Sequence, residues 1–277
     1  MTRRKKILMA AGVSVAVVLI VFVTVLAVYS AWQNKTVHIT AYTVEHEDIP
    51  KAFDGKRIVH LTDLHNKDYG GELQELVAAQ NPDIIVITGD WIGMMDEDLT
   101  PAKEQVRPLV DIAPVYFVPG NHERYSERWP QMQEYLTACG VTVMENIALN
   151  WEQDGQAIQL IGVFDSEFGY HLHTKLAPLV QEEMFSLLLY HRPERFPQAA
   201  ELGVDLLLCG HTHGGQIRLP WIGAIFAPDQ GWFPKYDVGR FEMDGSTMLV
   251  GQGLGESVYF RILTPPEIVV VTLKTTT

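Results

Sequence analysis

Two histidines separated by one residue stand in a glycine-rich segment, Gly210-His211-Thr212-His213-Gly214-Gly215-Gln216. The apolar run 204–209 precedes it and predicts a short buried strand that ends at this point. In an extended segment residues i and i+2 point the same way, so we expect His211 and His213 to reach one small volume. A His-x-His pair alone is more often solvated or structural, and the interpretation depends on the rest of the chain.

Four earlier predicted strands also end in polar clusters. These are Thr62-Asp63-Leu64-His65, Thr88-Gly89-Asp90, Pro119-Gly120-Asn121-His122-Glu123 and Tyr190-His191-Arg192. Ligands bind beyond the carboxyl ends of strands in α/β sheets, so five strand ends at one edge predict a shared site. The seven candidate ligands are Asp63, His65, Asp90, Asn121, His191, His211 and His213. Singly, each has an ordinary alternative as a helix cap, a turn residue or an exposed histidine.

The chemistry of these seven side chains indicates a metal centre. Carboxylate, imidazole and amide ligands without thiolate suit manganese, iron or zinc, and we favour manganese. Seven ligands are too many for one ion with an open position but suit two divalent ions that share a carboxylate. Cys139 and Cys209 lie in apolar surroundings, which predicts free buried thiols and excludes a cysteine-based zinc cluster.

The elements that position these residues follow an alternating pattern. Strands are predicted at 57–62, 83–88 and 114–118, with helices at 72–80, 101–111 and 127–138 between and after them. Further strands are predicted at 157–163, 186–190, 204–209, 247–250, 258–262 and 268–273, with helices near 176–184 and 194–201. We therefore expect an α/β fold in which two sheets form a β-sandwich flanked by helices, in four layers.

The amino end predicts a membrane anchor. Residues 1–6 form a basic tail, and residues 7–32 are uncharged, apolar and long enough to span a bilayer. The basic tail should stay in the cytoplasm, which places a linker at 33–44 and a catalytic domain at 45–277 outside the cell membrane. Tyr29 and Trp32 are expected at the far membrane interface. The length of the segment favours a retained single-pass signal-anchor over a cleaved signal, and the twin-arginine match is weak because of Lys6.

The charge of the chain limits its partners. The net charge is −13, and residues 3–6 contribute +4, so the remainder carries −13 − 4 = −17. Such an acidic domain is a poor partner for the nucleic-acid backbone, which makes nucleic acid an unlikely ligand and disfavours a nuclease.

The ordered motifs resemble those of the calcineurin-like metallophosphoesterases over residues 55–275. The motifs are Asp63-x-His65, Gly89-Asp90, Gly120-Asn121-His122-Glu123, His191 and Gly210-His211-x-His213. The ending Gly251-Gln252-Gly253-Leu254-Gly255 with Pro265-Pro266-Glu267 is similar to the membrane-anchored bacterial branch. The resemblance implies the four-layer metallophosphoesterase fold, one ion at Asp63, His65 and His213, a second at Asn121, His191 and His211, and Asp90 between them. Gly93 departs from the family, which often has an acidic residue there that does not bind metal.

The resemblance also implies a reaction. We expect hydrolysis of a phosphate ester or pyrophosphate by a metal-bridging hydroxide, with His122 as the catalytic residue that stabilises the transition state or protonates the leaving oxygen. Glu123 either orients His122 or is a solvated loop acid. Arg192 either pairs with phosphate or forms a surface salt bridge.

The location suggests a class of substrate. A tether beside the bilayer favours a phosphorylated small molecule or lipid head group, including a cell-envelope precursor. The alternative is a membrane-tethered envelope-binding protein with structural metals and no turnover. An aromatic group at Trp221, Phe226, Trp232, Phe233 and Tyr236 either faces lipid or closes the second sheet.

Overall fold

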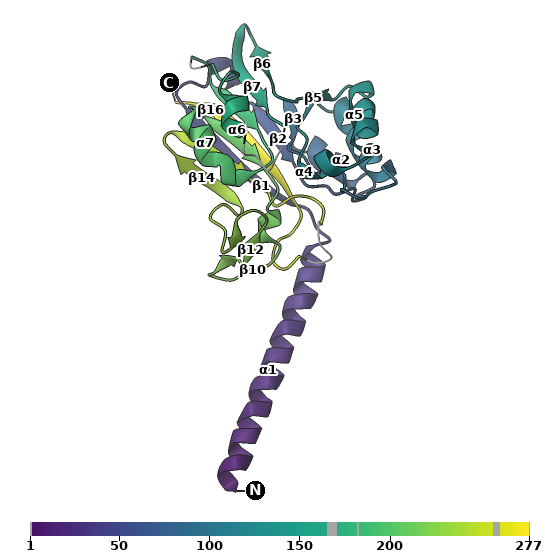
Figure 1. Cartoon of the computed structure of the whole chain (residues 1–277), viewed down its shortest axis with the longest axis vertical. Coiled ribbons are helices and arrows are strands. Elements are labelled where there is room, and N and C mark those ends of the chain that lie inside the picture. The colour runs from purple at the N-terminus through teal and green to yellow at the C-terminus, as the bar shows by residue number, and fades with distance from the viewer. Residues whose placement is uncertain (1, 165–170, 182, 257–260, 277) are drawn as a thin grey trace.

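A computed structural model describes residues 2–164, 171–181, 183–256 and 261–276. It consists of one long helix and a domain built on two sheets (Figure 1). Of the predicted strand 258–262, residues 258–260 lie outside the described part.

The first sheet has six strands in the order β1-β16-β2-β3-β4-β5. Their bounds are His38–His46, Glu267–Thr275, Arg57–Leu61, Ile84–Ile87, Val115–Phe117 and Thr142–Val143. Strands β2 to β5 are parallel, β1 is parallel to β16, and β16 is antiparallel to β2. Strand β3 is buried at every residue, as its continuous β-branched sequence requires in a sheet covered on both faces.

The second sheet also has six strands, in the order β14-β15-β9-β8-β7-β6. Their bounds are Gly239–Met243, Ser246–Val250, Leu206–Cys209, Ser186–Leu189, Gln156–Gly162 and Ile147–Gln153. The four central strands are parallel, and each outer strand joins its neighbour as an antiparallel pair.

The two sheets pack face to face and helices cover their outer faces. Alternate residues divide between the layers: Ile58 and Leu187 lie between the sheets, whereas Val59 and Leu188 face the helices. The helices over the first sheet are α2 (Glu72–Ala78), α3 (Thr100–Val106) and α5 (Trp129–Ala138), and those over the second are α6 (Leu172–Leu176) and α7 (Phe196–Glu201). The predicted four-layer α/β fold is confirmed.

Several boundaries differ from the prediction. The expected helix at 101–111 is α3 followed by the 3₁₀ helix η2 (Arg107–Asp111), because Pro108 cannot donate the backbone hydrogen bond of a continuing α-helix. The helix expected near 176–184 is the earlier α6. Both cysteines are free, as predicted, but Cys139 is only half-buried.

Short elements join the main strands. They are η1 (Lys51–Phe53), α4 (Asn121–Tyr125), η4 (Pro193–Arg195) and η5 (His213–Gly215). Two small hairpins follow η5: β10 (Arg218–Leu219) with β11 (Gly223–Ala224), and β12 (Phe226–Ala227) with β13 (Gly231–Trp232).

Helix α1 (Arg3–Gln33) projects from one end of the domain (Figure 1). It is long and apolar enough to cross a membrane, and none of its most apolar stretch is buried against the domain. Strand β1 (His38–His46) follows α1 in the chain.

Candidate metal centre

The seven predicted ligands follow strands that the two sheets place close together. Asp63 and His65 follow β2, Asp90 follows β3, and Asn121 follows β4 in the first sheet. The remaining three histidines follow β8 and β9 at the middle of the second sheet, and they are His191, His211 and His213. The structure therefore brings these strand ends close together, as the sequence predicts.

One group of ligand atoms consists of Asp63, His65 and His213. The Nε2 atoms of His65 and His213 lie 3.0 Å apart. Asp63 Oδ1 lies 3.5 Å from His213 Nε2 and 3.8 Å from His65 Nε2. Three lone-pair atoms thus converge on one small volume, as a divalent cation requires.

A second group consists of Asp90, His191 and His211. His191 Nε2 lies 3.1 Å from Asp90 Oδ2 and 3.2 Å from His211 Nδ1. The other ring nitrogens have partners elsewhere: His191 Nδ1 donates to the Thr88 carbonyl at 2.7 Å, and His211 Nε2 lies 2.8 Å from Asp229 Oδ2. These contacts fix the ring tautomers and leave one lone pair of each imidazole directed at the centre.

Asp90 lies between the two groups of ligand atoms. It also lies in a group with His65 and His122, so its carboxylate stands between the two sets of histidines. Asn121 Oδ1 is buried and, among the described residues, accepts no hydrogen bond. A buried amide oxygen without a partner costs free energy, and a cation beside it would satisfy it.

The protonation states suit cation binding. Burial lowers the pKa of His65 to about 3 and of His211 to about 4, and it lowers the pKa of His213 well below its usual value. Burial opposes ionisation of Asp90, yet His191 and the neighbouring histidines hold its pKa well below the usual range. Burial raises the pKa of Asp63 to about 6. Neutral imidazoles beside carboxylates fit divalent metal ions.

The backbone at the site is strained. Five of the seven predicted ligands have positive φ: Asp63 (51°), His65 (47°), Asp90 (52°), His211 (71°) and His213 (50°). Such angles are uncommon outside glycine and concentrate at functional sites. They also correct the prediction for His211 and His213, because the segment is not extended and the two rings enter different ligand groups.

Two glycines permit the close approach of the loops. A Cβ on Gly210 would lie 2.0 Å from Thr62 Oγ1 and 2.2 Å from Asp63 Oδ2. A Cβ on Gly120 would lie 2.4 Å from Asp90 Oδ1. Any larger residue at either position would therefore displace a predicted ligand.

His122 lies beside the two groups. Its Nδ1 accepts a hydrogen bond from the Met94 backbone N–H at 3.1 Å, and its Nε2 lies 3.8 Å from Asp90 Oδ2. Because Nδ1 accepts, the neutral ring carries its proton on Nε2, the atom that faces the centre.

Glu123 neither orients the His122 ring nor lies in solvent, which were the two predictions for it. It is fully buried, and its carboxylate accepts backbone N–H groups of Gly120, Asp90, Trp91 and Ile92 at 2.7 to 3.1 Å. It is therefore not a solvated acid, and these hydrogen bonds hold the backbone of the Asp90 loop rather than the His122 ring. Burial and the charge of Asp90 raise the pKa of Glu123 to about 7, against the effect of these N–H donors.

The departure at Gly93 is accommodated locally. Its backbone N–H donates to Asp96 Oδ2 at 2.5 Å, and a Cβ there would meet the same carboxylate at 2.7 Å. The Asp96 side chain thus occupies the space beside Gly93.

Sequence reasoning missed Asp229. Its carboxylate pairs with both Arg192 and His211, and these contacts lower its pKa to about 2. Arg192 is itself buried, so it does not form a surface salt bridge. Asp229 lies in a turn between two-residue strands, where no apolar pattern marks a strand end. The sequence signal was only its Pro-Asp turn.

A cavity of about 270 Å³ opens beside the centre. It is lined by Asp90, Met94, Asn121, His122, Tyr125, Arg192, His211, His213, Pro228 and Asp229. Its walls combine predicted ligands, His122 and a buried guanidinium, a set that suits an anionic phosphate group.

Comparison with known proteins agrees with this geometry. Residues 56–215 match the calcineurin-like phosphoesterase family. The metallophosphoesterase YkuE of Bacillus subtilis is 32% identical over 254 residues, which cover 87% of this chain and 86% of the relative. The phosphodiesterase YaeI of Escherichia coli is 28% identical over 225 residues, which cover 78% of this chain and 82% of the relative.

A third relative shares the membrane feature. A transmembrane protein with a metallophosphoesterase domain from Danio rerio is 29% identical over 73% of this chain and 50% of its own length. The family match covers more than half of the chain and includes the strand ends that carry the histidine and aspartate groups. The chain belongs to the calcineurin-like phosphoesterase family and is a metal-dependent phosphoric ester hydrolase.

Proposed function

We propose that this protein is a dinuclear phosphoesterase that hydrolyses a phosphate ester or pyrophosphate. The observation that carries the proposal is the position of Asp90, whose carboxylate belongs to one group of ligand atoms with His191 and His211 and to another with His65 and His122. Asp63, His65 and His213 would hold one ion, and Asn121, His191 and His211 the other. The ions, with manganese favoured, would activate a water molecule as nucleophile and neutralise phosphate oxygens.

The protein's own residues bind and orient the substrate in this proposal. The Arg192 guanidinium and the Nε2–H of His122 border the cavity and would contact phosphate oxygens. His122 would stabilise the transition state or donate its Nε2 proton to the leaving oxygen. Asp229 would hold Arg192 and the His211 ring in place.

The substrate that we favour is a lipid head group or another cell-envelope phosphate. The support is the apolar helix α1, which would keep the domain beside a bilayer, and the basic residues 3–6, which would keep the amino end in the cytoplasm. The phosphodiesterase relative is consistent with a diester substrate.

Metal-dependent turnover tests the function. The purified full-length protein should hydrolyse a chromogenic phosphate mono- or diester with Mn²⁺ and lose this activity after chelation. Asp90→Asn should bind less metal and lose turnover, because the substitution removes charge from both ligand groups. Wild-type protein that binds two ions but hydrolyses neither ester would instead support a membrane-tethered binding protein, and Asp90→Asn that still holds two ions would exclude the shared ligand.

A further inference from the structure

An exposed apolar surface lies on the two small hairpins. Its members are Trp221, Ile222, Phe226, Trp232 and Phe233, and their exposed fractions run from 45% to 102%. We call them the aromatic hairpin surface. They do not close the second sheet, whose edge strands are β14 and β6. Tyr236, which the sequence groups with them, is buried against Phe196 and Phe241.

This surface lies next to the end of α1. Ile262 pairs with Ile217 and accepts the N–H of Arg218 at 2.9 Å, so it is joined to the start of the first hairpin. The preceding residue, Arg261, accepts hydrogen bonds through its carbonyl from Ser30 and Asn34 at the end of α1. Figure 1 shows β10 and β12 at the end of the domain from which α1 leaves, with the C-terminus at the opposite end.

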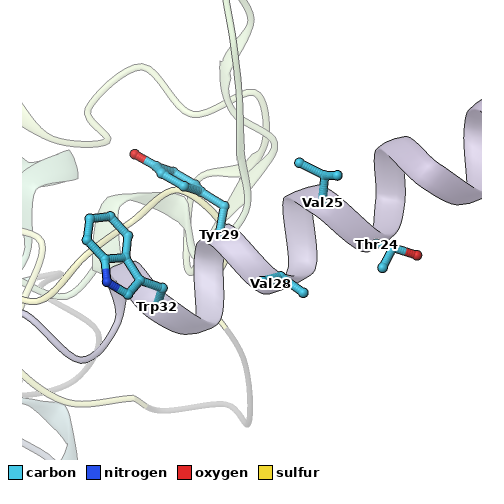
Figure 2. Close-up of a pocket in the computed structure, with 5 residues that line it drawn as sticks. All are labelled: Thr24, Val25, Val28, Tyr29 and Trp32. Atoms are coloured by element: carbon cyan, nitrogen blue, oxygen red, sulfur yellow. The ribbon is translucent and has the colours of Figure 1, made fainter.

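The length of α1 sets the level of the bilayer surface. From Ile7 to Tyr29 a helix rises about 33 Å, close to the hydrocarbon thickness of about 30 Å. Tyr29 and Trp32 project side by side from the last turns, with ring centroids 5.8 Å apart (Figure 2). Aromatic side chains of this kind mark the boundary between acyl chains and head groups. The adjacent hairpins therefore stand at that boundary.

We propose that the aromatic hairpin surface is a second membrane contact, seated in the bilayer interface beside α1. Monomeric proteins seldom leave so many large apolar side chains on one exposed patch, and a bilayer would remove them from water. The occupant is lipid rather than another protein because the chain's own helix brings the bilayer to this place. The contact depends on apolar and aromatic insertion, since the acidic domain gains nothing from anionic lipid.

The same hairpins border the metal centre. The turn between β12 and β13 supplies Pro228 and Asp229 to the cavity wall, while Phe226 and Trp232 of the same hairpin are exposed. A Cβ on Gly215 would lie 2.2 Å from the Ala224 side chain, so the first hairpin packs directly on the histidine loop. Membrane seating would thus hold the cavity beside the head groups, a consequence that rests on the proposed phosphoesterase function.

Quenching by lipid tests the contact in the full-length protein. In a Cys139→Ser background, Ile222→Cys carries an environment-sensitive fluorophore, and Glu152→Cys on exposed strand β6 is the matched control. After reconstitution into phosphatidylcholine vesicles, brominated acyl chains should reduce emission from position 222 and leave position 152 unchanged. Equal emission with and without bromine at position 222, or equal quenching at both positions, would overturn the proposal.

A second variant separates the contact from the chemistry. Trp221→Ser with Phe233→Ser should reduce quenching at position 222 and leave Mn²⁺-dependent hydrolysis of soluble bis(p-nitrophenyl) phosphate unchanged, because neither side chain borders the cavity. Quenching equal to that of the parent protein would overturn the proposal. Absence of hydrolysis in the wild type would instead count against the phosphoesterase function and leave the quenching result intact.

Discussion

At the scale of single residues, His122 lies in a group with His65 and Asp90 but differs from the seven predicted ligands, because its Nδ1 accepts a hydrogen bond from the Met94 backbone. We expect His122→Ala to retain its metal ions and to lose turnover by about 10²- to 10⁴-fold, the usual contribution of a proton donor. Steady-state kinetics together with metal analysis of the purified variant measure both effects. Normal turnover would remove His122 from the reaction, and loss of metal would make it a ligand.

His60, which is not a predicted ligand, provides a test of how stability depends on pH. It is buried in β2 with Nε2 2.7 Å from Thr88 Oγ1, and burial lowers its pKa from 6.5 to about 3. The unfolded chain therefore binds a proton between these values that the folded protein does not. Its contribution to stability is complete above pH 6.5 and is lost as the pH falls.

Replacement of His60 should remove this dependence. The free energy of unfolding of His60→Gln should fall less steeply from pH 6 to pH 4 than that of the wild type, by about 1 kcal/mol per pH unit. Urea titrations at a series of pH values measure the two slopes. Parallel slopes would show that the folded protein protonates His60 as readily as the unfolded chain does.

The candidate metal ligands were predictable from the sequence, but the residues that hold them in place, Glu123 and Asp229, were not. Asp63 and His213 belong to short motifs at strand ends, and their residue types alone indicate the chemistry. The contacts of Glu123 depend on the backbone of a different loop, and those of Asp229 on a turn 18 residues after His211. Neither partnership leaves a pattern in the local sequence.

At the scale of elements, the loop after β9 depends on the absence of a side chain at Gly210. We expect Gly210→Ala to weaken metal binding by about 10- to 100-fold, as displacement of a ligand's supporting contacts usually does. Gly71→Ala is the matched control, because a Cβ there meets nothing within 4 Å and its φ is negative. Metal titration followed by calorimetry compares the two variants. Equal affinities would mean that Thr62 and Asp63 shift without cost.

Strands were easier to predict than the segments between them. A continuous apolar run such as 84–87 is typical of a strand inside a sheet covered on both faces, and β3 lies in such a position. His211 and His213 follow such a strand, yet both have positive φ, and the backbone N–H of His211 donates to the Asp63 carboxylate of a distant loop. The hairpins β10 to β13 have strands of two residues, too short for periodicity to reveal.

At the scale of the whole molecule, the alternation of strands and helices predicted the layered fold, but it did not predict how α1 is attached. The end of the helix is joined to the domain by Ser30 and Asn34, which donate to the Arg261 carbonyl. The Arg261 side chain in turn donates to the carbonyls of Gly253 and Gly255. Contacts across more than 220 residues arise only when the chain is folded.

The orientation of α1 in the membrane gives the last prediction. Basic residues 3–6 flank one end of an otherwise uncharged span, so the amino end should remain in the cytoplasm and the domain should lie outside. In a Cys139→Ser background, a membrane-impermeant maleimide added to bacterial spheroplasts should label Glu152→Cys and not Thr2→Cys, whereas lysed spheroplasts should be labelled at both positions. The reverse pattern would place the catalytic domain in the cytoplasm, beside the inner leaflet. That result would still be compatible with the proposed lipid contact of the hairpins, but it would exclude an envelope substrate.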